Sequence, residues 1–199
     1  MIVLTIDQRD SRHNPDRVEE LVTALNAEYP VVRAFERTAG DELQGVMDDG
    51  AAAVRLLLEV AREGHWSIGL GVGSVKNPLP EQTRAGAGEA FEAARDAVER
   101  AKHAPASVAV AGAGGEAQRL EAELQLVAEV NARRTEASRA AGLLVDSGFS
   151  QREAATRLGI TQQAVSSRLA SGLWFPCRQL ADQAGLALAR YTAQFDGDD

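Results

Sequence analysis

The stretch SQREAATRLGITQQAVSSRL, residues 150–169, determines the fold expected for the C-terminal part of the chain. Ser150 can cap a helix, with Glu153 three residues later as its capping-box partner. Gly159 can adopt the left-handed conformation that ends this first helix, and Thr161 can cap a second one. Two short helices joined by a tight glycine turn are typical of a helix-turn-helix, whose second helix enters the major groove of DNA.

The apolar residues of this stretch have the spacing of a core shared by the two helices. Ala155 is small where the helices would cross, and the side chains expected in the core are Leu158, Ile160, Val165 and Leu169. Residues 159–161 (GIT) and 165–169 (VSSRL) also resemble the promoter-reading helix-turn-helix of sigma-factor region four. An ordinary helical hairpin with solvated arginines is the alternative interpretation.

The outward-facing residues of the two helices are the candidates for DNA contact. A glutamine can pair bidentately with adenine, and a serine can hydrogen-bond to either base of a pair. Arginines suit phosphates, which set the register of the complex rather than its sequence preference. The predicted DNA-binding residues are Arg152, Arg157, Thr161, Gln162, Gln163, Ser166 and Arg168.

The charge distribution agrees with this interpretation. The chain of 199 residues has a net charge of −8, with 21 Lys and Arg against 29 Asp and Glu. Residues 131–178 nevertheless carry seven arginines and only three acidic residues. A basic segment within an acidic protein is the electrostatic pattern expected of a DNA-contacting module.

The composition excludes several other classes of protein. No apolar run approaches the roughly 20 residues that cross a bilayer, and the N-terminus lacks the features of a signal peptide. The single cysteine, Cys177, can form neither an internal disulfide nor a thiolate cluster for zinc. We therefore expect a soluble, cytoplasmic protein without a membrane partner.

Residues 1–110 alternate between strand-like and helix-like patterns. The strands are predicted at 2–6, 31–37, 43–47, 66–75 and 107–110, and the helices at about 15–28, 50–63 and 88–102. This order implies a mainly antiparallel sheet with helices packed on it. Glycines at alternate positions of the fourth strand indicate that another backbone or a ligand approaches closely there.

A glycine-rich break separates this first part from the rest of the chain. Residues 111–115 read AGAGG, and from Glu116 to about Val145 the composition suggests one long connecting helix. We predict an α+β protein with a sheet domain at 1–110, the break and connecting helix at 111–140, and an all-α helix-turn-helix domain at 141–199.

Two acidic residues of the first domain lie at the end of a predicted strand and at the tip of a predicted hairpin. Asp7 ends the first strand, and Asp41 lies at the tip of the hairpin predicted between the second and third strands. If the first strand lies beside that hairpin, the two can converge on one Mg²⁺ or Mn²⁺ ion with a bound triphosphate. The alternative is that both are ordinary turn residues.

The element order and several passages resemble the palm of class III nucleotidyl cyclases and diguanylate cyclases. The passages are residues 6–7 (ID), 37–43 (RTAGDEL), 67–71 (SIGLG) and 93–95 (AAR). The resemblance spans most of residues 1–103 and implies a ferredoxin-like, cyclase-like palm that binds a purine nucleotide. It assigns metal binding to Asp7 and Asp41, and nucleotide binding to Arg37, Gly40, Phe91 and Arg95.

The departures from that pattern argue against turnover. Phe91 stands where class III adenylyl cyclases have the asparagine that orients the ribose, and Arg37 stands at the adenine-selecting lysine. Ala39 replaces the first glycine of the GGDEF-type loop. Because phosphoryl chemistry depends on positioning and electrostatics, these changes predict nucleotide binding without catalysis.

Nearly the whole chain, including residues 83–91 (TRAGAGEAF), resembles the SatD family of bacterial proteins. The resemblances together predict a transcriptional regulator that binds double-stranded DNA and senses a nucleotide. The alternatives are an active Mg²⁺-dependent nucleotidyl cyclase and a palm that only dimerises. The cyclase resemblance and the two-fold symmetry common in operators both favour a homodimer.

Overall fold

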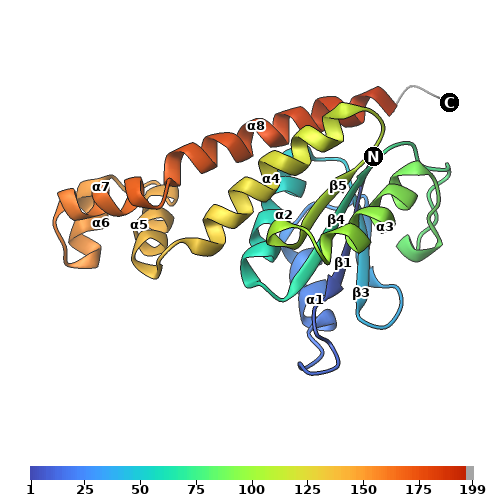
Figure 1. The fold of residues 1–199 in the computed structure, drawn as a ribbon, viewed down its shortest axis with the longest axis horizontal. Coiled ribbons are helices and arrows are strands. Elements are labelled where there is room, and N and C mark those ends of the chain that lie inside the picture. Colours follow the sequence, from blue (N-terminus) through green and yellow to red (C-terminus); the bar gives the residue numbers. More distant parts are fainter. Residues whose placement is uncertain (196–199) are drawn as a thin grey trace.

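A computed structural model describes residues 1–195, and Figure 1 shows a sheet-containing body from which a helical arm projects. Within these residues the strands are β1 (Ile2–Gln8), β2 (Arg33–Arg37), β3 (Glu42–Met47), β4 (Trp66–Val72) and β5 (Val108–Ala111). They form one sheet in the order β2-β3-β1-β4-β5. β1 is antiparallel to β3 and β4, and β2 is antiparallel to β3, whereas β5 is parallel to β4. The sheet is therefore mixed, and the predicted α+β class is confirmed.

One face of the sheet is covered by helices that share the main hydrophobic core. In β1 the even-numbered residues Ile2, Leu4 and Ile6 belong to this core and are fully buried. The helices that contribute to it are α1 (Val18–Glu28), α2 (Gly50–Glu63), α4 (Gly115–Arg133) and α8 (Trp174–Thr192). The bounds of α2 match the prediction, because Asp49 caps its first turn and Gly64 ends it in the left-handed conformation (φ 73°).

The opposite face of the sheet is covered by α3 (Glu89–Ala101), which lies directly on β4. A Cβ atom added to Gly69 would lie 2.2 Å from the backbone nitrogen of Val98, and one added to Gly71 would lie 2.2 Å from the carbonyl oxygen of Ala90. The close approach predicted at these glycines is therefore made by the backbone of α3.

The arm consists of α5 (Glu136–Asp146), α6 (Gln151–Leu158) and α7 (Gln162–Ser171). It has a small core, separate from that of the body, formed by Ala141, Ala154, Ala155, Val165 and Leu169 together with Trp174 at the start of α8. Leu158 and Ile160 pack against this core, as their spacing predicted. Residues 196–199 of the predicted second domain lie outside the described residues.

The single helix predicted from Glu116 to about Val145 is wrong, because the chain breaks at residues 134–135. There the side chain of Thr135 accepts a hydrogen bond from the backbone nitrogen of Ser138 at 3.1 Å and starts α5 as a new helix. The helix before the break, α4, packs into the core of the body, and α8 returns from the arm to pack on α2 and α4. The body thus comprises residues 1–133 together with α8.

Two predicted strands are shorter in the structure. β2 begins at Arg33 rather than at residue 31, and β4 ends at Val72 rather than at residue 75. After β4 the hydroxyl of Ser74 donates a hydrogen bond of 2.9 Å to Glu89 of α3, which turns the chain away from the sheet. Short 3-10 helices occur at Thr83–Ala85, Pro105–Ser107 and Ala193–Phe195.

Candidate functional site

The local structure of α6 and α7 follows from three side-chain and backbone features. Ser150 and Glu153 form the complete capping box at the start of α6. Gly159 ends α6 in the left-handed conformation, with φ 65°. The Thr161 hydroxyl accepts a hydrogen bond of 3.1 Å from the backbone nitrogen of Ala164 and caps α7. These features set the angle and spacing of the two helices.

The outer surface of α7 presents polar side chains with free hydrogen-bonding groups. Gln162, Gln163 and Ser166 are exposed, and their side chains make no hydrogen bond within residues 1–195. Val165 and Leu169, on the inner side of the same helix, are buried in the arm's core. The polar and apolar sides of α7 are therefore cleanly separated, and the polar one faces solvent.

The predicted arginines lie on the same two helices. In the described part of the chain, the guanidinium groups of Arg152 and Arg168 make no ion pair and no hydrogen bond. The guanidinium of Arg157 lies over the ring of Phe149, 4.0 Å from its centroid. α6 and α7 form the far end of the arm (Figure 1), so these cations stand away from the acidic body.

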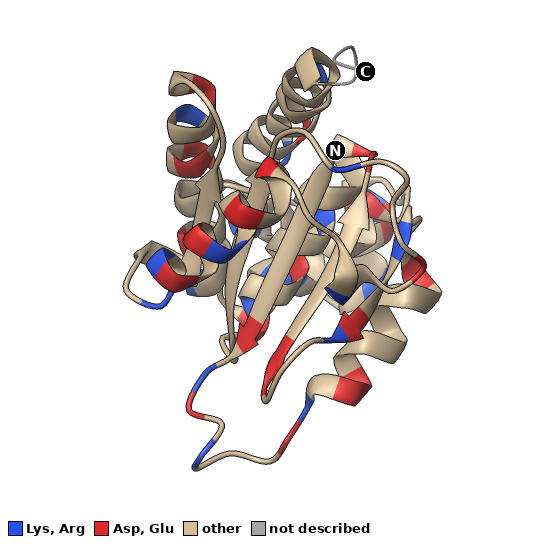
Figure 2. Ribbon diagram, turned by 90° about the vertical axis from the view of Figure 1, so that its right-hand side faces the viewer, with Lys and Arg blue, Asp and Glu red and all other residues tan. Residues whose placement is uncertain are grey.

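The two carboxylates of the predicted metal site lie at one end of the sheet. Asp7 faces Glu42 across the β1–β3 pair, and the backbone nitrogen of the next residue, Gln8, donates a hydrogen bond of 3.1 Å to the carbonyl oxygen of Asp41. Figure 2 shows acidic positions, in red, at the ends of two neighbouring strands. The structure therefore brings Asp7 and Asp41 into the same neighbourhood.

The pKa of the Asp7 carboxyl is raised from 3.8 to about 6, chiefly by burial. The Lys102 charge opposes this rise, and the nearby charges of Asp41 and Glu42 contribute smaller parts of it. The Lys102 ammonium lies 3.8 Å from the Asp7 carboxylate, and its own pKa is raised, chiefly by a hydrogen bond to Glu99. A lysine therefore already supplies part of the positive charge that a cation would bring.

Sequence reasoning missed a row of buried polar residues beside Asp7. Thr5, Gln44 and Ser67 are almost completely buried, and the Gln44 amide donates a hydrogen bond of 2.8 Å to the Thr5 hydroxyl. Among residues 1–195, the Oε1 of Gln44 and the Oγ of Ser67 find no hydrogen-bond partner. In the sequence, the only sign of this polar row was that Thr5 and Asp7 alternate with the buried apolar residues of β1.

The residues predicted to bind the nucleotide lie on two parts of the fold, the β2–β3 hairpin and α3. Arg37 is held by the carboxylates of α1 and its preceding loop, at 2.5 Å from Asp16 and 3.6 Å from Glu19. Phe91 is fully buried, and its ring fills the space in front of Gly86. Gly40 is exposed in the β2–β3 turn (φ 59°). Arg95 is exposed on α3 and makes no ion pair within residues 1–195.

The side chains at this end of the sheet do not make a complete cation site. Among residues 1–195, no three His, Cys, Asp or Glu side chains are arranged to hold a metal ion. Asp7 and Asp41 supply two carboxylates at most, and Lys102 competes for one of them. A divalent cation would therefore need further oxygen ligands, such as those of a triphosphate.

A scan against protein-family models and searches of curated proteins and of solved structures found no match to this chain. No described helix is both long enough and apolar enough to cross a membrane. The functional interpretation therefore depends on the geometry of the arm and of the sheet.

Proposed function

We propose that this chain is a DNA-binding regulator of transcription in which α7 enters the major groove. The observation that carries the proposal is the outer surface of α7, where Gln162, Gln163 and Ser166 are exposed and free to hydrogen-bond. Side chains of these types recognise base edges. The free cations of Arg152 and Arg168 lie on the same two helices and suit the flanking phosphates.

The test uses the full chain and duplexes selected by it from a random pool, with affinity measured by fluorescence anisotropy. Gln163→Ala should cost about 1–3 kcal/mol at the selected sequence only, because it removes a base contact. Arg168→Ala should weaken binding to all sequences and reduce the salt dependence, because fewer counterions are released. The controls are Gln118→Ala and Arg190→Ala, which change exposed residues of the body.

Two outcomes would contradict the proposal. One is that the full chain binds no duplex even at low salt. The other is that Gln163→Ala and Gln118→Ala have the same effect at the selected sequence.

We also propose that a homodimer binds a two-fold-symmetric site, since a single recognition helix reads only a few base pairs. Light scattering of the complex should then give two chains per duplex.

The second candidate function is binding of a purine nucleotide with Mg²⁺ or Mn²⁺ at the end of β1. The element order β-α-β-β-α-β in the first part of the chain supports a ferredoxin-like, cyclase-like palm. The observation that favours the site is the proximity of Asp7 and Asp41, since burial raises the pKa of Asp7 and the charge of Asp41 adds to that rise. Since Phe91 is buried and Arg37 is ion-paired, we expect no cyclisation.

Titration calorimetry with ATP and GTP, with and without Mg²⁺, tests this second function. Binding should require the cation and should be lost in Asp41→Asn but not in Asp96→Asn, which changes an exposed carboxylate of α3. Chromatography of the same samples should detect no cyclic product. Cation-independent binding or no binding would refute the nucleotide site, and abundant cyclic nucleotide would establish the alternative of an active cyclase.

A further inference from the structure

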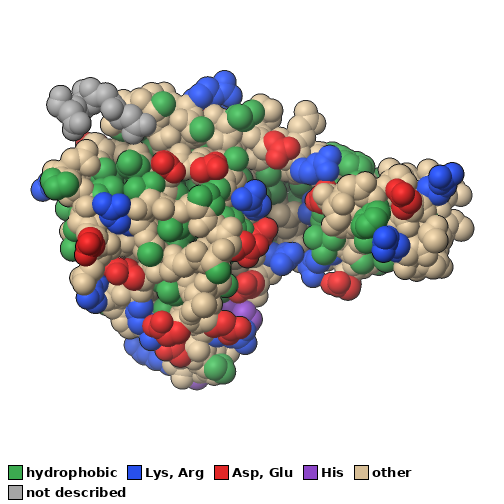
Figure 3. Space-filling model, turned by 180° about the vertical axis from the view of Figure 1, so that it is seen from behind, with side chains coloured by type: hydrophobic (Ala, Val, Ile, Leu, Met, Phe, Trp, Pro, Cys, Tyr) green, Lys and Arg blue, Asp and Glu red, His purple; other side chains and the backbone are tan. Residues whose placement is uncertain are grey.

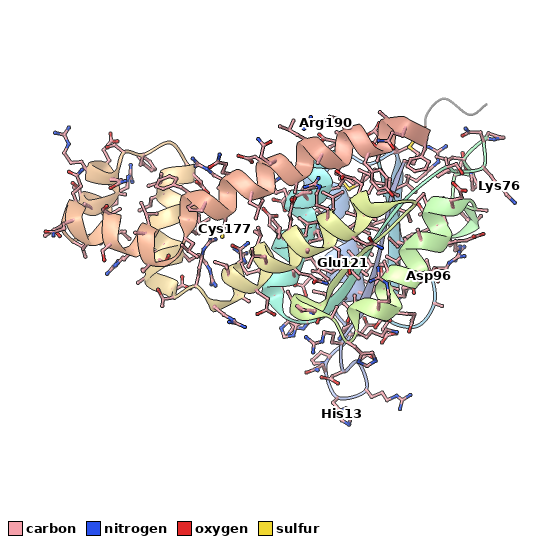
Figure 4. The ribbon with its side chains drawn as sticks, turned by 45° about the horizontal axis from the view of Figure 1, so that its top comes forward. His13, Lys76, Asp96, Glu121, Cys177 and Arg190 are labelled. Carbon is pink, nitrogen blue, oxygen red and sulfur yellow. The ribbon has the colours of Figure 1, made fainter. Side chains whose placement is uncertain are left out.

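A cavity of about 340 Å³ lies between the body and the arm. Its walls come from α2, α4 and α8 of the body and from α5 of the arm. Figure 4 shows Cys177, one of its lining residues, near the start of α8 where the arm joins the body. Small-molecule sites have volumes of roughly 300–1,000 Å³ and occur preferentially between domains. The cavity is distinct from the carboxylates at the end of β1.

The cavity carries an excess of positive charge. The cations that line it are Arg55, Arg62, Arg134, Arg139 and Arg178. The lining carboxylates are fewer: Glu59, Asp146 and Asp182. Asp146 is already paired with Arg178 at 2.7 Å, and Glu59 accepts a hydrogen bond from the Tyr29 hydroxyl. Figure 3 shows basic side chains where the arm meets the body.

Among residues 1–195, three of these arginines have no carboxylate partner: Arg55, Arg62 and Arg134. Within residues 1–195, the side chain of Arg62 makes no ion pair or hydrogen bond. Arg134 donates to the carbonyl oxygens of Gly172 (2.7 Å) and Leu173 (3.3 Å) and lies over the Trp174 ring, 4.5 Å from its centroid. Burial lowers the pKa of the Arg134 guanidinium. A partly buried cation without a counter-charge favours binding of an anion.

The remaining wall of the cavity is apolar and contains an unsatisfied acceptor. The apolar lining includes Val54, Leu58, Val127 and Leu143, and Leu143 is 50% exposed although it is a large hydrophobic residue. The Oδ1 of Asn131, another lining residue, is buried and has no hydrogen-bond partner in the described part of the chain. Buried acceptors of this kind are normally satisfied by a water or ligand donor.

We propose that this cavity binds an organic anion that combines an apolar body with one carboxylate or phosphate group. The anionic group would lie at the unpaired Arg62 and at Arg139, which pairs at 3.0 Å with the exposed Glu136 of its own helix. The apolar body would cover Leu143 and the leucine and valine side chains of α2. This site goes beyond the proposed function, because it requires neither DNA nor a nucleotide.

Titration calorimetry of the full chain with three matched probes tests the proposal. 1-Naphthoate and 1-naphthyl phosphate share an apolar body and differ in the anionic group, so they distinguish the two head groups; 1-naphthalenemethanol is the uncharged control. At least one of the two anions should bind with one-to-one stoichiometry, at least tenfold more tightly than the alcohol. The affinity should fall with added salt, because the pairing is electrostatic.

The variants Arg62→Ala and Arg139→Ala should each weaken anion binding at least fivefold. The control Arg190→Ala, which changes an exposed arginine of α8 outside the cavity, should leave it unchanged. Arg62 has no partner to lose, so that variant should fold normally, which thermal unfolding would verify. Failure of both anions to bind, or equal effects of all three substitutions, would overturn the proposal.

Discussion

At the scale of single residues, Asp7 combines burial with an acidic environment. Its side chain is only 18% exposed, and the charges of Asp41 and Glu42 oppose its ionisation. Lys102 compensates in part, at 3.8 Å. Because the pKa is about 6 in the folded chain and 3.8 when unperturbed, ionised Asp7 destabilises the folded state. The penalty is absent below about pH 4 and complete above the folded pKa.

Asp7→Asn should therefore stabilise the protein at pH 7 by roughly 1–3 kcal/mol, because one unit of pKa shift corresponds to about 1.4 kcal/mol. The gain should diminish as the pH falls from 7 to 4, where wild-type Asp7 is protonated in both states. Urea unfolding of both proteins at several pH values measures this difference. Asp96→Asn is the control, and a gain that does not depend on pH would show that the ionisation of Asp7 is not its cause.

At the scale of elements, the contact between α3 and β4 requires glycine. A Cβ atom on Gly71 would lie 2.2 Å from the carbonyl oxygen of Ala90 and 2.3 Å from the nitrogen of Ala94. Both are backbone atoms of a helix and cannot rotate away. We expect Gly71→Ala to destabilise the fold by about 3 kcal/mol or more, since α3 would have to move from the sheet.

Gly115→Ala is the matched control for this prediction. A Cβ atom at Gly115 meets nothing within 4 Å, and the residue starts a helix, so alanine should be neutral or stabilising by up to about 1 kcal/mol. Chemical unfolding compares the two variants directly. Equal stabilities of the two variants would show that α3 does not need the close approach.

Elements with strong signals at both ends could be predicted from the sequence. The bounds of α2, α6 and α7 follow from Asp49, Ser150 and Thr161 at their starts and glycines at their ends. The break before Thr135 could not be predicted, because helix-forming residues continue on both sides of it. The cavity was equally inaccessible, since its lining comes from four helices that are far apart in the sequence.

At the scale of the whole molecule, two short linkers attach the arm to the body. One is residues 134–135 between α4 and α5, and the other is residues 172–173 between α7 and α8. Arg134 belongs to the first linker, and its guanidinium donates hydrogen bonds to both carbonyl oxygens of the second, those of Gly172 and Leu173. Arg134 therefore joins the two linkers. Leu173 adopts a left-handed conformation there (φ 49°), which L residues other than glycine rarely do. The orientation of the arm is therefore set at these two linkers.

Arg134→Lys should loosen the arm without unfolding the body. Lysine keeps the charge but lacks the planar fork that reaches two carbonyl oxygens and stacks on Trp174, so we expect a loss of about 1–2 kcal/mol at this junction. Hydrogen exchange should then quicken in α5 and α7, while β1 and β4 stay protected. The neighbouring Arg133→Lys is the control, because Arg133 is exposed and its one ion pair within residues 1–195 is with Glu129 of its own helix. Equal protection of the arm in the two variants would show that it is held by its apolar contacts alone.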